Sequence, residues 1–454
     1  MILVYTPRIS SRIEYISGLL LGNILGADWE CTSDKKRLEG FNGPKISYGK
    51  QPPARDTLHI PASGFLMERG VHFFFPEMDY FDDLPALFPV PDPADNTLHF
   101  DLFAAAFYLV SRYEEYLPHH ADAHGRFQVS ESFAYKNKFY TCAVVNRYAL
   151  LIKKRLLQSH QGYPFKASAF SFMPTYDIDV AYAYQGRSLF RNLFGIMRSV
   201  GQLDIQSLKK RFMVIIKKEK DPFDTYDYQL ELSKKYGIKA YYFFLCADYG
   251  PYDKNLAPIS KKFVSLVKTL GDYAHIGIHP SYRSNVEEDL LQNEINRLAG
   301  ILNQEIHCSR QHYLKMTLPK TYQILLKHDV RFDFTMGFAG RPGFRASIAT
   351  PFQFYDLELE KETPLIVVPL TVMDGTLRNY MGLSPAEAWQ VVKQLIMEAE
   401  EVGGTFSTLW HNDTLRSDND PEGWVQFYEK MYHYASKKHI KTQNNDPLYS
   451  ARKY

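Results

Sequence analysis

The pattern of hydrophobic and polar positions changes near residue 165. Before that point, short apolar runs and amphipathic stretches follow one another irregularly, which predicts a mixed α/β domain over residues 1–165. Its predicted strands are Ile2–Tyr5 and Asp56–Pro61, and its predicted helices are Ser10–Ile24, Asp101–Tyr116 and Val144–Leu157. The apolar run inside the first helix has the length of a signal-peptide core, but the strand-like start and Glu14 favour a packed helix.

From Ala167 onward, strands and helices alternate regularly. The predicted strands are Phe170–Tyr176, Ile238–Leu245, Ala274–Ile278, Glu305–Arg310, Arg331–Thr335, Leu365–Leu370 and Thr405–Trp410. Helical patterns separate most of them, at Tyr226–Tyr236, Ser260–Leu270, Val286–Leu302, Pro319–His328 and Ser384–Val402, and Glu422–Ser436 follows the last strand. This alternation predicts an α/β fold, a seven-stranded (β/α) barrel over residues 166–442, with residues 443–454 as a tail.

Composition excludes several classes of protein. The 454 residues are 45% hydrophobic and 23% charged, which is ordinary for a folded globular chain. With 53 Lys and Arg against 51 Asp and Glu, the net charge of +2 gives no reason to expect a nucleic-acid partner. No apolar run reaches the length of about 18 residues that a membrane span needs. The four cysteines are far apart and form no CxxC pair, so we expect free thiols and a cytoplasmic location.

Polar side chains gather where the predicted strands end, which is where parallel barrels carry their chemistry. Asp177 and Asp179 end the first strand, two residues apart, and therefore leave it on the same side. Such a pair can serve as a base and as a ligand for a divalent ion. The third, fourth and seventh strands are followed by His279, by Arg310 with His312 and Tyr313, and by His411.

This order of motifs resembles the polysaccharide deacetylase family, carbohydrate esterase family four, over about residues 168–440. Thr175 to Asp179 (TYDID) matches its T-F-D-D-G motif, and Arg310 to Tyr313 (RQHY) matches R-x-P-[FY]. Leu409 to His411 (LWH) is similar to its last motif. The resemblance implies a metal-dependent hydrolase that removes N- or O-acetyl groups from a polysaccharide or related acylated sugar. It implies these roles: Asp177 as base, Arg310 as the group orienting that base, Tyr313 as a backbone donor to the oxyanion, and His411 as general acid.

The same resemblance implies a divalent metal, with zinc as the first candidate, held by Asp179, His279 and His312. The sequence departs from the family here, because Ile178 occupies the position of the aspartate ligand and Arg283 that of the second histidine ligand. An arginine cannot bind zinc, so His312 is the candidate replacement from a neighbouring strand. Three aromatic residues are expected to stack on sugar faces: Tyr282, Phe344 and Trp410.

Three alternatives remain open at this point. One is an inactive glycan-binding member of the same fold, favoured by Arg283. Another is a glycosyltransferase in which Asp177 and Asp179 form a metal-binding D-x-D, and a third is a hydrolase of non-sugar amides. Residues 187–220 hold nine Lys or Arg against two acids, with apolar residues between them. They are expected to form a hairpin over the site or a basic amphipathic element that meets an anionic glycan or lipid surface.

Overall fold

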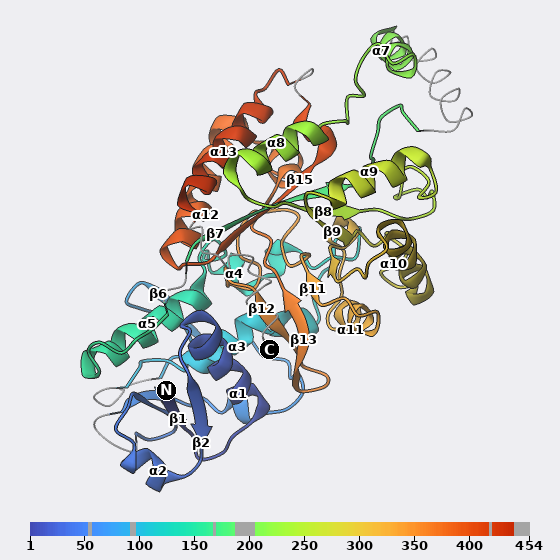
Figure 1. Cartoon of the computed structure of the whole chain (residues 1–454). Helices are drawn as coiled ribbons and strands as arrows, with labels where there is room; N and C mark the ends of the chain where they lie inside the picture. The colour runs from blue at the N-terminus through green and yellow to red at the C-terminus, as the bar shows by residue number, and fades with distance from the viewer. Residues whose placement is uncertain (53–56, 91–96, 167–168, 187–204, 417–419, 440–454) are drawn as a thin grey trace.

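The computed structural model describes residues 1–52, 57–90, 97–166, 169–186, 205–416 and 420–439 (Figure 1). The predicted tail at 443–454 and the first half of the 187–220 segment lie outside these ranges. The chain begins with a parallel sheet in the order β2-β1-β3-β4. Its strands are β1 (Ile2–Tyr5), β2 (Trp29–Thr32), β3 (Lys45–Gly49) and β4 (Leu58–Pro61).

Helices pack against this first sheet. The predicted helix at the start of the chain is confirmed as α1 (Ser11–Ser17), which continues as a π-helix, η1 (Gly18–Ile24). The helix predicted from Asp101 is shorter, since α3 (Leu102–Val110) ends before Arg112, whose φ of 54° is left-handed. The other elements here are α2 (Lys35–Gly40), η2 (Phe65–Met67), β5 (Met78–Phe81), β6 (Leu84–Leu87), η3 (Tyr113–Tyr116), η4 (Val129–Glu131), α4 (Phe133–Lys136) and α5 (Val144–Ser159).

A second sheet dominates the rest of the molecule, in the order β12-β13-β11-β10-β9-β8-β7-β15-β14. Its strands are β7 (Ser171–Ile178), β8 (Tyr241–Phe244), β9 (His275–Ile278), β10 (Cys308–Ser309), β11 (Phe332–Asp333), β12 (Phe352–Asp356), β13 (Lys361–Val367), β14 (Val372–Met373) and β15 (Thr405–His411). All neighbouring strands are parallel except β12 and β13. The predicted parallel α/β architecture is therefore confirmed.

The closed seven-stranded barrel stays a prediction, because the paired strands form an open ladder with β12 and β14 at its edges. The predicted strand Leu365–Leu370 covers the end of β13 and part of the segment between β13 and β14. That connecting segment bonds to both halves of the sheet. Val368 donates its N–H to the carbonyl of Asp333 at 2.8 Å, and Thr371 donates to Ser407 at 3.0 Å. The two halves are thus connected through the segment between β13 and β14.

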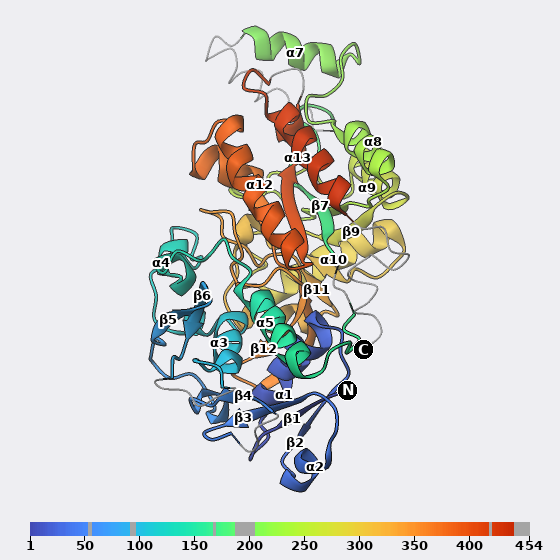
Figure 2. The ribbon, with the colours of Figure 1, turned by 90° about the vertical axis from the view of Figure 1, so that its left-hand side faces the viewer.

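Helices cover the second sheet, with α12 and α13 side by side over β15 and β7 (Figure 2). The bounds are α8 (Tyr226–Tyr236), α9 (Lys261–Gly271), α10 (Glu288–Leu302), α11 (Lys320–Lys327), α12 (Pro385–Glu401) and α13 (Trp424–Lys438), with short turns η5 (His312–Leu314), η6 (Thr376–Tyr380) and η7 (Asn412–Leu415). Ser384 and Glu387 form a capping box at the start of α12, which explains why that helix begins there. Helix α7 (Ile205–Ile215) stands away from the sheet in both views, and no helix in the described ranges is long and apolar enough to cross a membrane.

The first and second sheets share one cluster of buried apolar side chains. The antiparallel hairpin β12–β13, which the sequence did not predict, lies against the N-terminal helices. Tyr15 of α1 donates its hydroxyl to the carbonyl of Gln353 at 2.7 Å. Arg12, which is 1% exposed, pairs with Glu360 at 2.5 Å. Residues 1–165 are therefore packed firmly on the second sheet.

Candidate metal centre and active site

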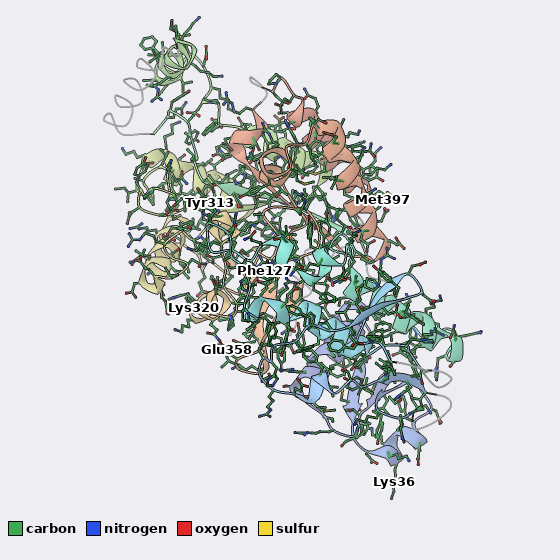
Figure 3. The ribbon with its side chains drawn as sticks, turned by 180° about the vertical axis from the view of Figure 1, so that it is seen from behind. Lys36, Phe127, Tyr313, Lys320, Glu358 and Met397 are labelled. Carbon is green, nitrogen blue, oxygen red and sulfur yellow. The ribbon has the colours of Figure 1, made fainter. Side chains whose placement is uncertain are left out.

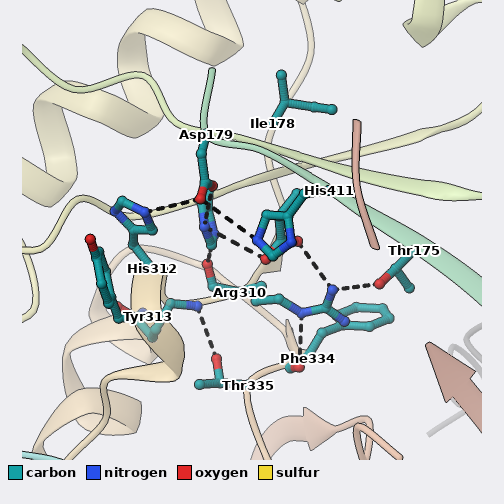
Figure 4. Close-up of polar contacts among 12 residues, drawn as sticks. Thr175, Ile178, Asp179, Arg310, His312, Tyr313, Phe334, Thr335 and His411 are labelled. Carbon is teal, nitrogen blue, oxygen red and sulfur yellow. Dashed lines mark hydrogen bonds and ion pairs between the residues drawn. The ribbon is translucent and has the colours of Figure 1, made fainter. Parts of the chain in front are cut away.

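The polar residues predicted at the strand ends converge in one place (Figure 4). Asp177 ends β7 directly opposite His411 of β15, because these two strands are paired in register. Ile178, between the two acids, is fully buried, and both acids lie within 3.6 Å of Nε2 of His279, so Asp177 and Asp179 point to the same side. The alternation of a strand thus explains why the second acid stands at position 179.

Three of these residues form a candidate metal site. One ligand atom from each of Asp179, His279 and His312 lies within 4.8 Å of the other two. The Nε2 atom of His279 is 3.1 Å from Oδ1 of Asp179, and Nε2 of His312 is 3.3 Å from its Oδ2. Two imidazoles and a carboxylate are the ligands that zinc accepts in catalytic sites with an open position. Arg283 does not enter the site, because its side chain is 67% exposed and pairs with Glu287.

Contacts at Nδ1 orient the imidazoles of both His279 and His312. Nδ1 of His279 is 2.5 Å from the carbonyl oxygen of Arg310, and Nδ1 of His312 is 2.9 Å from a carboxylate oxygen of Asp253. A carbonyl only accepts hydrogen bonds, so Nδ1 of His279 carries the proton and Nε2 presents its lone pair to the site. Partners of this kind fix the orientation of histidine ligands in metal sites. The donor set and its support therefore fit a divalent ion.

Nearby charges shift the pKa values of His312 and Asp179 more than burial does. Burial lowers the pKa of His312, but Asp179 and Asp253 outweigh that effect and raise it to about 9. Burial raises the pKa of Asp179, but the two imidazoles hold it well below its ordinary value. The site therefore favours a positive charge between its acids, which a proton or a metal ion can provide.

The expected base, Asp177, is 2% exposed. Nη1 of Arg310 donates to Oδ1 of Asp177 at 3.1 Å. Arg310 is itself fully buried, and its Nε donates to the carbonyl of Phe334 at 3.1 Å while Nη1 also donates to the hydroxyl of Thr175. The guanidinium is held in position beside the carboxylate.

The expected acid, His411, has its own carboxylate partner. Nδ1 of His411 is 2.8 Å from Oδ1 of Asp374, whose other oxygen accepts from the backbone N–H of His411 at 2.9 Å and from the hydroxyl of Thr414 at 2.6 Å. Nε2 of His411 lies 3.7 Å from Oδ2 of Asp179. Burial lowers the pKa of His411, but Asp374 and Asp179 raise it well above its ordinary value. The ring can therefore hold a proton next to the candidate metal site.

The sequence analysis missed two carboxylates of this site, Asp253 and Asp374. Asp374 directly follows β14, and Asp253 lies in the loop after β8, so both follow strand ends. Asp374 carried the same signal as the residues that were found, because it directly follows a strand. Asp253 lies nine residues beyond the end of β8, in a loop whose path the sequence does not specify.

Two of the three aromatic residues expected to stack on sugars are buried, which corrects the prediction for them. Trp410 is 2% exposed and packs on Phe427 and Tyr428 of α13, because it points to the opposite face of β15 from His411. Phe344 is fully buried. These two residues are therefore not available to a substrate.

Tyr282 lies near the site, and its ring packs on two neighbours. Tyr252 stacks on it at 4.3 Å between ring centroids, and Nζ of Lys315 lies over the ring at 4.1 Å. Stacking of a sugar on Tyr282 stays a prediction.

One family model matches the N-terminal region of the chain. Residues 2–161 match the model of a family of unknown function, DUF7033. No protein among the curated sequences matches the chain.

Solved structures similar to the chain cover its larger part. A putative polysaccharide deacetylase from Mycobacterium smegmatis is 11% identical, with a TM-score of 0.42, over 64% of this chain and 93% of that one. Puue allantoinase is 12% identical, with a TM-score of 0.41, over 64% and 93%. A probable polysaccharide deacetylase from Pseudomonas aeruginosa PAO1 is 12% identical, with a TM-score of 0.40, over 63% and 92%. These likenesses are slight, so the function has to be argued from the geometry of the site.

Proposed function

We propose that the chain is a metal-dependent hydrolase that removes N- or O-acetyl groups from a polysaccharide or related acylated sugar. One observation carries the proposal. Asp179, His279 and His312 converge as ligands, with an arginine-held carboxylate, Asp177, on one side and a carboxylate-held imidazole, His411, on the other. A base, an acid and a metal site within a few ångströms of one another are the groups that hydrolysis of an unreactive amide or ester requires.

Each group has a distinct task in this proposal. A bound divalent ion, with zinc as the first candidate, would polarise the acyl carbonyl and make water acidic enough to attack near neutral pH. Asp177 takes the proton from the attacking water, and Arg310 orients Asp177 through a hydrogen bond. The backbone N–H of Tyr313 donates to the oxyanion that develops on the acyl group. His411, protonated with the help of Asp374, gives its proton to the leaving amine or alkoxide.

Metal content and acetate release test the proposal together. We expect the purified protein to hold about one zinc ion per chain, as a three-ligand site would. We expect it to release acetate from N-acetylchitopentaose or from acetylated xylan fragments. Dialysis against a chelator should remove both the metal and the activity, and added zinc should restore both. Binding of these sugars without acetate release would favour the inactive glycan-binding alternative instead, and binding of a nucleotide-sugar would favour the glycosyltransferase.

We propose separately that the described part of the basic segment, helix α7, contacts an anionic surface. Helix α7 exposes Ile205 and Phe212, at 74% and 61%, next to Lys209. Apolar and basic residues on one short helix are typical of elements that lie on anionic membranes. Co-sedimentation with phosphatidylserine vesicles, and its loss in Phe212→Ser, tests this.

A further inference from the structure

A loop from the N-terminal region reaches the candidate active site. Residues Ala121 and Phe127 pair as an antiparallel bridge, and Asp122 fixes the turn between them. One carboxylate oxygen of Asp122 accepts from the N–H groups of His124 at 2.9 Å and of Arg126 at 3.0 Å. Gly125 adopts a φ of 76°, which the tight turn requires and which glycine adopts without strain. The loop Ala121–Phe127 therefore has a defined shape.

Arg126 joins this loop to two sides of the site. Its Nη1 donates to the carbonyl of Tyr313 at 2.8 Å, and its Nη2 donates to the hydroxyl of Tyr380 at 3.0 Å. Its Nε donates to Asp122 at 2.7 Å, and the side chain is only 9% exposed. Tyr313 follows the metal-site residue His312, whereas Tyr380 ends the turn η6 that begins two residues after Asp374. Arg126 thus bridges the metal side and the general-acid side of the site.

His124 belongs to a cluster of four aromatic rings beside the metal site, which we call the four-ring cluster: His124, Tyr252, Tyr282 and Tyr313. The ring of His124 lies 4.8 Å from that of Tyr313, between centroids, and its Nδ1 is 3.3 Å from the hydroxyl of Tyr282. Tyr313 in turn lies 4.6 Å from the ring of His312. Only one ring therefore separates His124 from a candidate metal ligand (Figure 3 labels Tyr313 and the end of the loop, Phe127).

Two groups of the four-ring cluster are accessible to a ligand, the ring of Tyr252 and Nε2 of His124. Tyr252 is 47% exposed, although it packs on the rings of Tyr282, His124 and Tyr313. Within the ranges that the structure describes, no hydrogen-bond partner is present for Nε2 of His124, whose ring is partly exposed. An exposed aromatic face beside a free ring nitrogen suits a sugar, which presents C–H groups on its faces and hydroxyls on its rim.

We propose that the loop Ala121–Phe127 is part of the substrate-binding site, so that residues 2–161 complete the site that the second sheet carries. His124 contacts the sugar unit next to the acyl group, and Arg126 is a positioning residue that holds Tyr313 and Tyr380. The proposal rests on the acyl-sugar hydrolase function proposed above and assigns a role to the N-terminal region in that function.

Sugar binding by His124 variants tests this inference. Affinity for N-acetylchitopentaose and for acetylated xylan fragments would be measured by calorimetry in a Asp177→Asn background, which keeps the substrate intact. Loss of one hydrogen bond and one ring contact should weaken binding by about tenfold in His124→Ala. His124→Gln, which keeps a donor near the position of Nε2, should recover part of the loss. The matched control is His120→Ala, since His120 is exposed in the preceding turn and contacts none of the four rings.

Steady-state kinetics in the otherwise unchanged chain separate the two roles. His124→Ala should raise KM with little change in kcat, whereas Arg126→Ala should lower kcat because Tyr313 loses its support. Arg126→Lys should restore part of kcat, and zinc content should stay at the wild-type level in all of these variants. A purely structural role would lower thermal stability without this division between KM and kcat.

The outcomes distinguish the inference from the function on which it rests. An active wild type whose sugar affinity and KM do not change in His124→Ala would overturn the inference and leave the hydrolase function standing. A wild type that binds sugars without releasing acetate would overturn the hydrolase function, and weaker binding in His124→Ala would still support the role of the loop. A wild type that neither binds nor cleaves either probe would overturn both.

Discussion

Asp177 is the residue at which chemistry and metal binding can be separated most cleanly. Its Oδ2 lies 3.6 Å from Nε2 of His279, and its Oδ1 is held by Arg310. We predict that Asp177→Asn loses at least about a thousandfold in acetate release and keeps its zinc, because asparagine preserves the shape but cannot take a proton. Metal analysis beside initial rates checks this. Loss of zinc in Asp177→Asn would make Asp177 a ligand instead of the base.

His312 decides whether the metal site is complete without a histidine at position 283. We predict that His312→Ala and His279→Ala each lose zinc and activity together, because removal of one imidazole from a three-ligand site weakens binding by orders of magnitude. Zinc titration with a competing chromophoric chelator measures the loss. His307→Ala serves as a control, since His307 is a partly exposed histidine before β10 whose ring contacts Asp329 and Glu305 and none of the site residues. Retention of wild-type zinc affinity in His312→Ala would leave His312 a packing residue.

Particular side chains show how far the sequence predicts this site. The strand ends were recognisable from the alternation of the chain, which is why Asp177, His279, Arg310 and His411 were found. The prediction that Trp410 contacts a sugar was wrong, although the sequence could have excluded it. Neighbouring residues on a strand point to opposite faces, so Trp410 points away from the site when His411 points into it. Asp253 was beyond prediction, since it reaches His312 only through the fold of a loop in which no pattern specifies direction.

At the scale of elements, the predicted helices and strands correspond closely where periodicity is strong. Helix α8 has the predicted bounds, and β8 and β9 pair in parallel as predicted. The hairpin β12–β13 was missed because the first half of β13 is polar and exposed, and its partners lie on the N-terminal helices. A strand whose burial depends on a distant part of the chain leaves little periodic signal in its own sequence.

Strand β9 contains a glycine that the packing requires. A Cβ on Gly277 would lie 2.6 Å from the ring of Phe243 and 2.8 Å from the carbonyl of Cys308. The same ring lies under the guanidinium of Arg310, at 4.7 Å. We predict that Gly277→Ala destabilises the fold by about 1–3 kcal/mol and lowers kcat, because the displaced ring disturbs Arg310.

Urea unfolding and initial rates measure both effects of Gly277→Ala. Gly300→Ala is the matched control, because Gly300 lies in α10 with nothing within 4 Å of its added Cβ. Alanine there should stabilise the helix by roughly 0.5–1 kcal/mol. Equal stability of the two variants would contradict the close approach of β8, β9 and β10 described here.

At the scale of the whole molecule, buried ion pairs connect the N-terminal region to the second sheet. Glu115, within η3, accepts from Nε of Arg112 at 2.7 Å and from Nε and Nη2 of Arg345 at 2.8 and 2.6 Å. All three side chains are at most 4% exposed. Arg345 lies in the connection between β11 and β12, so this network fastens the loop region around Phe127 to the rest of the chain.

Acid should weaken this connection. Burial raises the pKa of Glu115, but Arg345 and Arg112 outweigh it and lower the pKa from 4.5 to about 2. A lowered pKa in the folded state contributes stability that is complete above pH 4.5 and is lost as the pH falls toward about 2. The difference corresponds to roughly 3 kcal/mol. We predict that the urea midpoint falls between about pH 5 and about pH 3, and that Glu115→Gln shows a smaller fall, since it lacks the titrating group.

The same network predicts that Glu115→Gln and Glu401→Gln differ greatly in the stability that they remove. Glu115→Gln leaves Arg112 and Arg345 buried with less negative charge beside them, and removal of one partner from a buried pair costs about 3–5 kcal/mol. Glu401 also joins the two parts, through Arg147 at 2.9 Å, but its side chain is 64% exposed. Water screens that pair, so Glu401→Gln should cost less than about 1 kcal/mol. Urea unfolding at neutral pH compares them, and similar midpoints for the two variants would mean that the Arg112, Glu115 and Arg345 network does not hold the two parts together.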